Sequence, residues 1–138
     1  MRGVRLAIFG LLAILHSSFS PRQCAAQGVI STVAGGPSFF QGDPRPAVQA
    51  PLGRISAVAL DSAGNVYASD EENRVVVKIS PGGILTVAAG NSILGYSGDG
   101  GLATSASLMI PSGLALDLAG NLYVADELNG RVRKVSAK

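Results

Sequence analysis

A glycine-rich segment at residues 98–103 (GDGGLA) is the first candidate for chemistry, because closely spaced glycines can cradle a phosphate. A dinucleotide loop of this kind opens a helix after a strand and is followed by an acidic residue about 20 positions later. Here residues 111–113 (PSG) interrupt any helix, and the corresponding residues 42–47 (GDPRPA) lack the middle glycines. We therefore expect an ordered loop and no nucleotide site.

Carboxylates gather at two corresponding positions of the chain. They are Asp70, Glu71 and Glu72 at the first and Asp126 and Glu127 at the second. Oxygen ligands of this kind suit Ca²⁺, so a calcium site is one interpretation. In the other, which we favour, Asp70 and Asp126 accept hydrogen bonds from turn amides or pair with a nearby arginine, and the glutamates are solvated. Arg74 and Arg131 are the candidate arginines, and we expect no metal and no cofactor.

Basic residues alternate near the end of the chain, where Arg131 and Arg133 share one face of a predicted strand and Lys134 lies on the other. A nucleic-acid surface is one interpretation, and a solvated strand that protects a sheet edge is the other. We favour the second and expect no nucleic-acid partner.

Aromatic side chains stand in two long linkers, where they could anchor a partner or pack the linker onto the fold. They are Phe39, Phe40 and Tyr96. Packing is the interpretation that we favour, so the ligand-binding residues stay unassigned.

The first 26 residues have the pattern of a secretory signal peptide. Arg2 and Arg5 precede an apolar run of ten residues, 6–15, which is shorter than the roughly 17–25 residues that span a bilayer. Small residues follow at 24–26 (CAA), so we expect cleavage after Ala26 and a secreted or periplasmic product without a membrane span.

Cleavage would change the chemical inventory. Because Arg2, Arg5 and Arg22 leave, the 11 basic residues become 8 against 9 acidic ones, a net charge of −1. His16 and Cys24, the single histidine and the single cysteine, leave as well. The mature chain then lacks the usual general base, the strongest nucleophile and any zinc ligand other than carboxylates, so we expect that it is not an enzyme.

The rest of the chain, residues 27–138, contains two copies of one repeat unit. Residues 30–34 (ISTVA) recur as 84–88 (ILTVA), an offset of 54, and 64–67 (GNVY) recur as 120–123 (GNLY), an offset of 56. The first repeat covers about 30–83 and the second about 84–138. Such internal repetition is typical of modular folds whose units bury their faces against each other.

Each unit predicts short strands joined by tight turns. In the first, we expect strands over 56–61, 65–69, 74–79 and 84–88, separated by Asp, Gly, Asn and Pro residues with turn chemistry. A lone four-stranded meander cannot bury both of its faces, and blade-to-blade packing in a β-propeller solves that problem. The predicted fold class is therefore all-β, with about two four-stranded blades of an incomplete propeller.

Residues 111–117 (PSGLALD), 120–126 (GNLYVAD) and 129–135 (NGRVRKV) together resemble an NHL repeat. The first copy resembles it with departures, such as 54–56 (RIS) in place of 110–112 (IPS), and the linker at 98–104 resembles the bacterial exported subgroup of that family. This resemblance covers residues 29–135 and implies six-bladed propellers. The family includes lyases, receptor ectodomains and RNA- or protein-binding domains, and its lyases bind a metal through histidines that the mature chain lacks.

The expected strands do not add up to two complete blades in chain order. We expect residues 29–34 to form a fourth strand without its blade and the last blade to lack its fourth strand. The chain is then a fragment of a longer propeller, a unit that closes a six-bladed ring head to tail with two other copies, or a two-blade addition to another protein.

These features favour an exported, non-catalytic binding or scaffold module, with a protein, peptide or glycan ligand outside the cytoplasm. Its partners would be copies of itself, another propeller fragment or an extracytoplasmic ligand. The alternative is a fragment of a propeller lyase or hydrolase whose active-site blades are missing.

Overall fold

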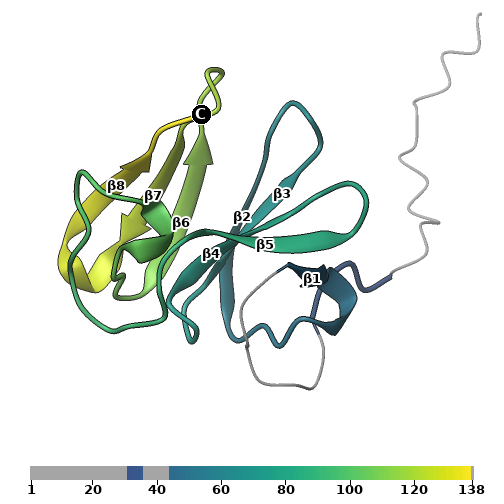
Figure 1. Ribbon diagram of the computed structural model, residues 1–138, viewed down its shortest axis with the longest axis horizontal. Helices are drawn as coiled ribbons and strands as arrows, with labels where there is room; N and C mark the ends of the chain where they lie inside the picture. Colours follow the sequence, from purple (N-terminus) through teal and green to yellow (C-terminus); the bar gives the residue numbers. More distant parts are fainter. Residues whose placement is uncertain (1–30, 36–43, 138) are drawn as a thin grey trace, which may run out of the picture. The chain divides into compact units, whose positions relative to one another are not determined.

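Two antiparallel sheets make up the fold of the computed structural model, which describes residues 31–35 and 44–137 (Figure 1). The first sheet has the order β1-β5-β4-β3-β2 and the second the order β6-β7-β8. No α-helix forms in the described ranges, so the all-β prediction is confirmed. The signal-peptide prediction for residues 1–26, Cys24 and His16 included, lies outside these ranges.

The first sheet contains blade 1, which we define as strands β2 to β5. Their bounds are Ile55–Leu60 (β2), Val66–Asp70 (β3), Val75–Ile79 (β4) and Ile84–Ala89 (β5). A two-residue strand, β1 (Arg45–Pro46), pairs with the outer side of β5 and continues into the 3-10 turn η1 (Ala47–Gln49). The four strands that the sequence predicted here are confirmed to within about a residue at each end.

Blade 2 is the three-stranded sheet. It follows the 3-10 turn η2 (Ala103–Ser105) and consists of β6 (Pro111–Leu116), β7 (Leu122–Asp126) and β8 (Arg131–Val135), with the turn η3 (Glu127–Asn129) before β8. Its register repeats that of blade 1 with an offset of 56, down to a bulge at Ile55/Ala57 and at Pro111/Gly113. The second meander thus has three of its four strands.

The first hairpin of each blade is closed by an aspartate. Asp61 Oδ1 accepts a bond from the Asn65 backbone N–H (2.9 Å) and Oδ2 from the Asn65 side chain (2.7 Å). Asp117 and Asn121 repeat the pattern at 2.8 and 2.7 Å. In both turns the asparagine side chain is the main cause that lowers the pKa of the aspartate. The turn chemistry read from the sequence therefore fixes the strand register.

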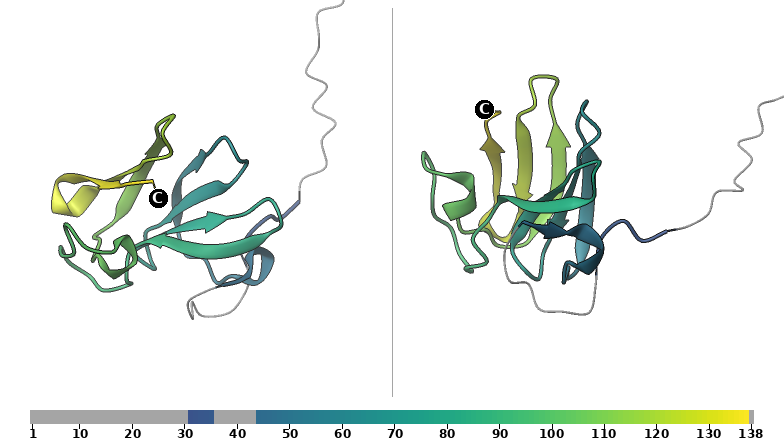
Figure 2. Two further views of the ribbon diagram at one scale, coloured as in Figure 1. Left: turned by 45° about the horizontal axis from the view of Figure 1, so that its top comes forward. Right: turned by 45° about the vertical axis from the view of Figure 1, so that its right-hand side comes forward.

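The two blades pack against each other through small and aliphatic side chains. A core shared by both blades contains Val76, Ala89, Leu108, Leu122 and Val124. A second core lies inside blade 1 and includes Val77 and Leu85. The first strands of the two blades, β2 and β6, lie side by side (Figure 2), and Ser56 Oγ donates to the Pro111 carbonyl oxygen across them (3.1 Å).

The expected strand over residues 29–34 is not formed by its described part. Residues 31–34 belong to no strand, and Ala34 packs against the blade 1 core. Gly35 N–H donates to the Ala47 carbonyl oxygen at 2.8 Å. β1, rather than these residues, pairs with the outer side of β5. The segment was expected to lack its blade, and in the described part of the chain it has no partner strand, so it does not form a strand on its own.

Candidate strand-binding groove

Gly98 fixes the loop that connects blade 1 to blade 2. Its φ is +88°, and a Cβ placed on it would lie 2.6 Å from the Ala106 Cα, so only glycine fits this close approach. Asn91 ties the loop further, because its side chain donates to the Ser105 carbonyl oxygen at 3.0 Å. Residues 98–103 therefore form the ordered loop that the sequence predicted, and no α-helix follows within residues 104–137.

Arg133 holds that loop against β8. Its guanidinium donates to Asp99 Oδ1 from Nε (3.0 Å) and from Nη2 (2.7 Å), and to the carbonyl oxygens of Ser97 (2.9 Å) and Ser107 (3.3 Å). It also donates to Asp126 Oδ2 at 3.2 Å, and the Asp126 side chain is fully buried. Only 10% of the Arg133 side chain is exposed. This arginine is thus a buried structural link between three segments.

Tyr96 packs beside the same arginine. The Arg131 guanidinium lies 4.0 Å and that of Arg133 4.9 Å from the centre of the Tyr96 ring. The Tyr96 hydroxyl donates to Asp99 Oδ2 at 2.5 Å. This hydrogen bond, and then Arg133, lowers the pKa of Asp99 below its ordinary value. Tyr96 thus contacts the arginines of β8, as packing of the linker onto the fold would predict, although it is 45% exposed; Phe39 and Phe40 lie outside the described residues.

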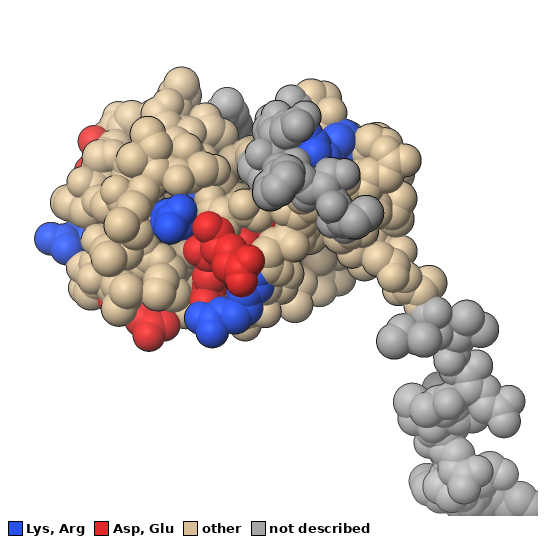
Figure 3. Space-filling view, turned by 90° about the horizontal axis from the view of Figure 1, so that it is seen from below, with Lys and Arg blue, Asp and Glu red and all other residues tan. Residues whose placement is uncertain are grey.

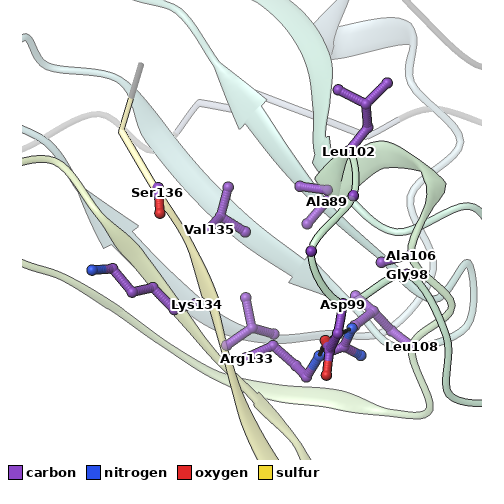
Figure 4. Close-up of a pocket in the computed structure, with 14 residues that line it drawn as sticks. Ala89, Gly98, Asp99, Leu102, Ala106, Leu108, Arg133, Lys134, Val135 and Ser136 are labelled. Atoms are coloured by element: carbon purple, nitrogen blue, oxygen red, sulfur yellow. Dashed lines mark hydrogen bonds and ion pairs between the residues drawn. The ribbon is translucent and has the colours of Figure 1, made fainter.

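A groove of about 410 Å³ opens between this loop and β8. The loop contributes residues 98–103 and Ala106, and β8 and its continuation contribute residues 133–136. Figure 4 shows Asp99 and Arg133 together at one side of the groove, with Leu102 and Val135 at other points of its wall. In the described ranges, β8 pairs with β7 alone. The groove thus runs along a strand edge whose backbone groups are available for pairing.

Blade 1 shows what such a groove can hold. There β5 lies between β4 and β1, pairing Val77 with Val87 on one side and Leu85 with Arg45 on the other. With the offset of 56, Val77 corresponds to Arg133 and Arg45 to Gly101, which both line the groove. The groove therefore occupies the position in blade 2 that a fourth strand occupies in blade 1.

The acidic residues singled out in the sequence have structural roles. Asp70 accepts bonds from the Gly53 N–H (2.9 Å) and the Asn73 side chain (2.7 Å), and Asp126 accepts from the Met109 N–H (2.7 Å). Hydrogen bonding to turn amides is confirmed by the Asn73 backbone N–H on Asp70 (3.0 Å) and the Asn129 side-chain amide on Asp126 (2.8 Å), whereas Gly53 and Met109 lie 17 residues earlier. Among the described residues, no three His, Cys, Asp or Glu side chains gather as a metal site would require.

Two details of that prediction were wrong. The arginine that pairs with Asp126 is Arg133 rather than Arg131, because Arg131 lies over Tyr96 instead. Glu71 is not solvated, since it forms an ion pair with Arg54 and its side chain is 9% exposed. Glu127 is exposed, as expected.

A second hollow, of about 340 Å³, is lined by residues of both signs, including Arg54, Arg74, Glu71 and Glu72. On the face shown in Figure 3, acidic and basic side chains likewise lie next to each other on a largely uncharged surface.

Sequence reasoning did not find the role of Arg133. Its polar partners come from positions up to 36 residues away, which no local pattern reveals. A signal was nevertheless present in the repeat, because Arg133 stands where the first unit has Val77. A charged residue at a core-facing repeat position indicates a local change of environment.

Comparison with known sequences gives one partial match. No family model matches the sequence. Teneurin-1 of Mus musculus is 30% identical in a match that covers 65% of this chain and 4% of Teneurin-1. Within residues 31–35 and 44–137, no helix is long and apolar enough to cross a membrane.

Solved structures with a similar fold include proteins from Bacteroides. A protein of unknown function from Bacteroides thetaiotaomicron has a TM-score of 0.64 and 18% identity, over 73% of this chain and 26% of its own. An auxiliary nutrient binding protein from Bacteroides ovatus has a TM-score of 0.58 and 22% identity, over 77% and 28%. Its counterpart from Bacteroides thetaiotaomicron has 0.56 and 22%, over 74% and 27%. These structures are β-propeller-like, which confirms the fold class, and this chain spans about a quarter of each.

Proposed function

We propose that this chain is an exported, non-catalytic binding module of NHL type, which takes up an extended peptide segment along β8. The observation that carries the proposal is the groove between β8 and residues 98–103, which occupies the fourth-strand position of blade 2. Addition of a strand to an exposed sheet edge is a common mode of peptide recognition, with affinity from main-chain hydrogen bonds and specificity from side-chain pockets.

The sequence and the comparisons support this assignment. The pattern of residues 1–26 supports export, and the described residues contain neither histidine nor cysteine, which supports a non-catalytic role. Auxiliary nutrient binding proteins stand among the solved structures with this fold. The motifs at 111–117 and 129–135 support the NHL relationship.

Ser136 provides the test of the binding mode. Its equivalent in blade 1, Ser80, donates its N–H to the carbonyl oxygen of Ile84 at the start of β5 (2.9 Å). Ser136 is exposed and lines the groove, so its N–H is the donor that an incoming strand would use. Ser136→Pro removes this N–H, whereas Ser136→Ala retains it.

The probe is a fluorescent peptide with the sequence of β5, ILTVAA, titrated into the purified chain and followed by anisotropy. We expect saturable binding, a loss of about fivefold in affinity for Ser136→Pro and little change for Ser136→Ala, since one net hydrogen bond is worth about 1 kcal/mol. A peptide with proline at its threonine should bind more weakly. Equal binding by the wild-type chain and Ser136→Pro, or no binding at all, would refute the proposal.

A further inference from the structure

The segment at residues 30–34 has the sequence of a strand that it does not form. Its letters, ISTVA, differ from those of β5, ILTVA, at one position. Residues 31–33 are exposed, and the Val33 side chain is 64% exposed. A β-branched sequence of this kind is suited to a sheet, so the segment is a candidate to complete a blade.

The same chain holds this segment away from its own groove. Ala34 packs against the core of blade 1, and Gly35 is bonded to Ala47 beside β1. Residues 31–35 and β8 lie at opposite ends of the described part of the chain (Figure 1). The groove of one chain can therefore meet the segment of another, whose bend at residues 33–34 would straighten into a strand on pairing.

The exposed outer faces of the two blades also fit contact between two copies of the chain. Leu114 and Leu116 of blade 2 pack on the shared core against Tyr67 and Val76 of blade 1. The repeat equivalents of the two leucines are Val58 and Leu60, which lie on the outer face of blade 1 and are 61% and 68% exposed.

The partner residues have equivalents as well. Tyr67 and Val76 correspond to Tyr123 and Val132, and Val132 on the outer face of blade 2 is 72% exposed. Each free face is therefore the counterpart of a face that is buried between the blades. A second copy placed by the same blade-to-blade step would bring Val58 and Leu60 of one chain onto Tyr123 and Val132 of the other.

We propose that residues 30–34 of a second copy of this chain occupy the groove. The two copies then associate head to tail, in the way that blade 2 packs on blade 1 within one chain. This inference rests on the strand-binding mode proposed above and names the partner. With the repeat offsets, Val33 of the incoming strand lies opposite Arg133, Thr32 opposite Lys134 and Ser31 opposite Val135. Such a heterologous contact closes into a ring, and three copies give the six blades that the NHL resemblance implies.

The test uses two defective variants with complementary defects. Thr32→Pro spoils the donor strand and leaves the groove intact, and Thr32→Val is its matched control. Ser136→Pro spoils the groove and leaves the donor intact, with Ser136→Ala as its control. Thr32 and Ser136 are both exposed, so all four chains should fold like the wild type.

We expect the wild-type chain and both controls to sediment at a concentration-independent mass near three times that of the chain. Thr32→Pro and Ser136→Pro should each sediment as monomers. Mixed together, the two proline variants should form a one-to-one complex, because each supplies what the other lacks. Leu60→Asp and Val132→Asp, at the exposed outer faces, should weaken the wild-type assembly.

The inference is overturned if the wild-type chain is a monomer, if it grows without closure as its concentration rises, or if the two proline variants do not associate. Titration of the ILTVAA peptide into the Thr32→Pro chain separates the two proposals. Peptide binding by that chain, together with a monomeric wild type, would leave the binding function standing and assign the groove to a segment of another protein. Absence of both would refute the two proposals together.

Discussion

Replacement of Arg133 by methionine should destabilise the chain far more than loss of an ordinary surface charge. Methionine retains the apolar stem of the side chain and removes only the guanidinium. That group bonds the fully buried Asp126 at 3.2 Å and the carbonyl oxygens of Ser97 and Ser107. Removing one partner of a buried pair costs about 3–5 kcal/mol, because the other charge stays buried.

We expect a value at the lower end, about 3 kcal/mol, because Asp126 retains two donors. The Met109 N–H at 2.7 Å and the Asn129 side chain at 2.8 Å still solvate its carboxylate. A small domain is stable by about 5–15 kcal/mol, so this loss would be a large part of the total.

Urea unfolding followed by circular dichroism measures the effect, with the m-value as a check that the unfolded states are comparable. Arg131→Ala is the control. Arg131 is exposed and stacks on the same Tyr96 ring, and its loss should cost about 1 kcal/mol or less. A cost for Arg133→Met no larger than that of the control, at an unchanged m-value, would refute the assignment of Arg133 as a buried link.

Two further predictions concern the loop and the pH dependence. Gly98→Ala should lower the melting temperature more than Gly130→Ala. Both glycines have positive φ, but a Cβ at Gly98 would lie 2.6 Å from the backbone of Ala106, whereas nothing lies within 4 Å of one at Gly130. Equal effects of the two substitutions in thermal unfolding would contradict this prediction. Because the folded-state pKa of Asp61, Asp99 and Asp117 lies below the ordinary value, the stability that these groups contribute is present above about pH 4 and is lost as the pH falls through the folded-state values. Acid unfolding should therefore begin below about pH 4 and be less steep in Asp99→Asn, and an identical profile in that variant would exclude Asp99 as a contributor.

The strands could be predicted because their signals are local. Asp61 and Asn65 mark a turn within five residues, Asp117 and Asn121 repeat it, and branched side chains fill the strands between the turns. The fold class follows from the repetition, since a repeated meander must bury its faces on its neighbours. These features depend on residues that lie close together in the sequence, within one repeat unit.

The groove could not be predicted in the same way. Its shape depends on Arg133 reaching Asp99 and Ser97, which lie 34 and 36 residues earlier in the chain. The pairing of β1 with β5 likewise joins distant parts of the chain, with Arg45 opposite Leu85. Both contacts depend on how distant segments pack together in the folded chain, which intrinsic strand propensity does not determine.

The charges of β8 bear on what its edge can accept. A strand edge that binds one segment is exposed to pairing with many others, and charged side chains are the usual protection. In β8 three of the five residues are basic, against one in β4. Arg133 is neutralised by Asp99 and Asp126, so Arg131 and Lys134 are the basic side chains of β8 that remain at the surface. A basic segment would therefore be repelled, whereas the uncharged segment 30–34 meets no such penalty, which is the selectivity that the proposed head-to-tail contact requires.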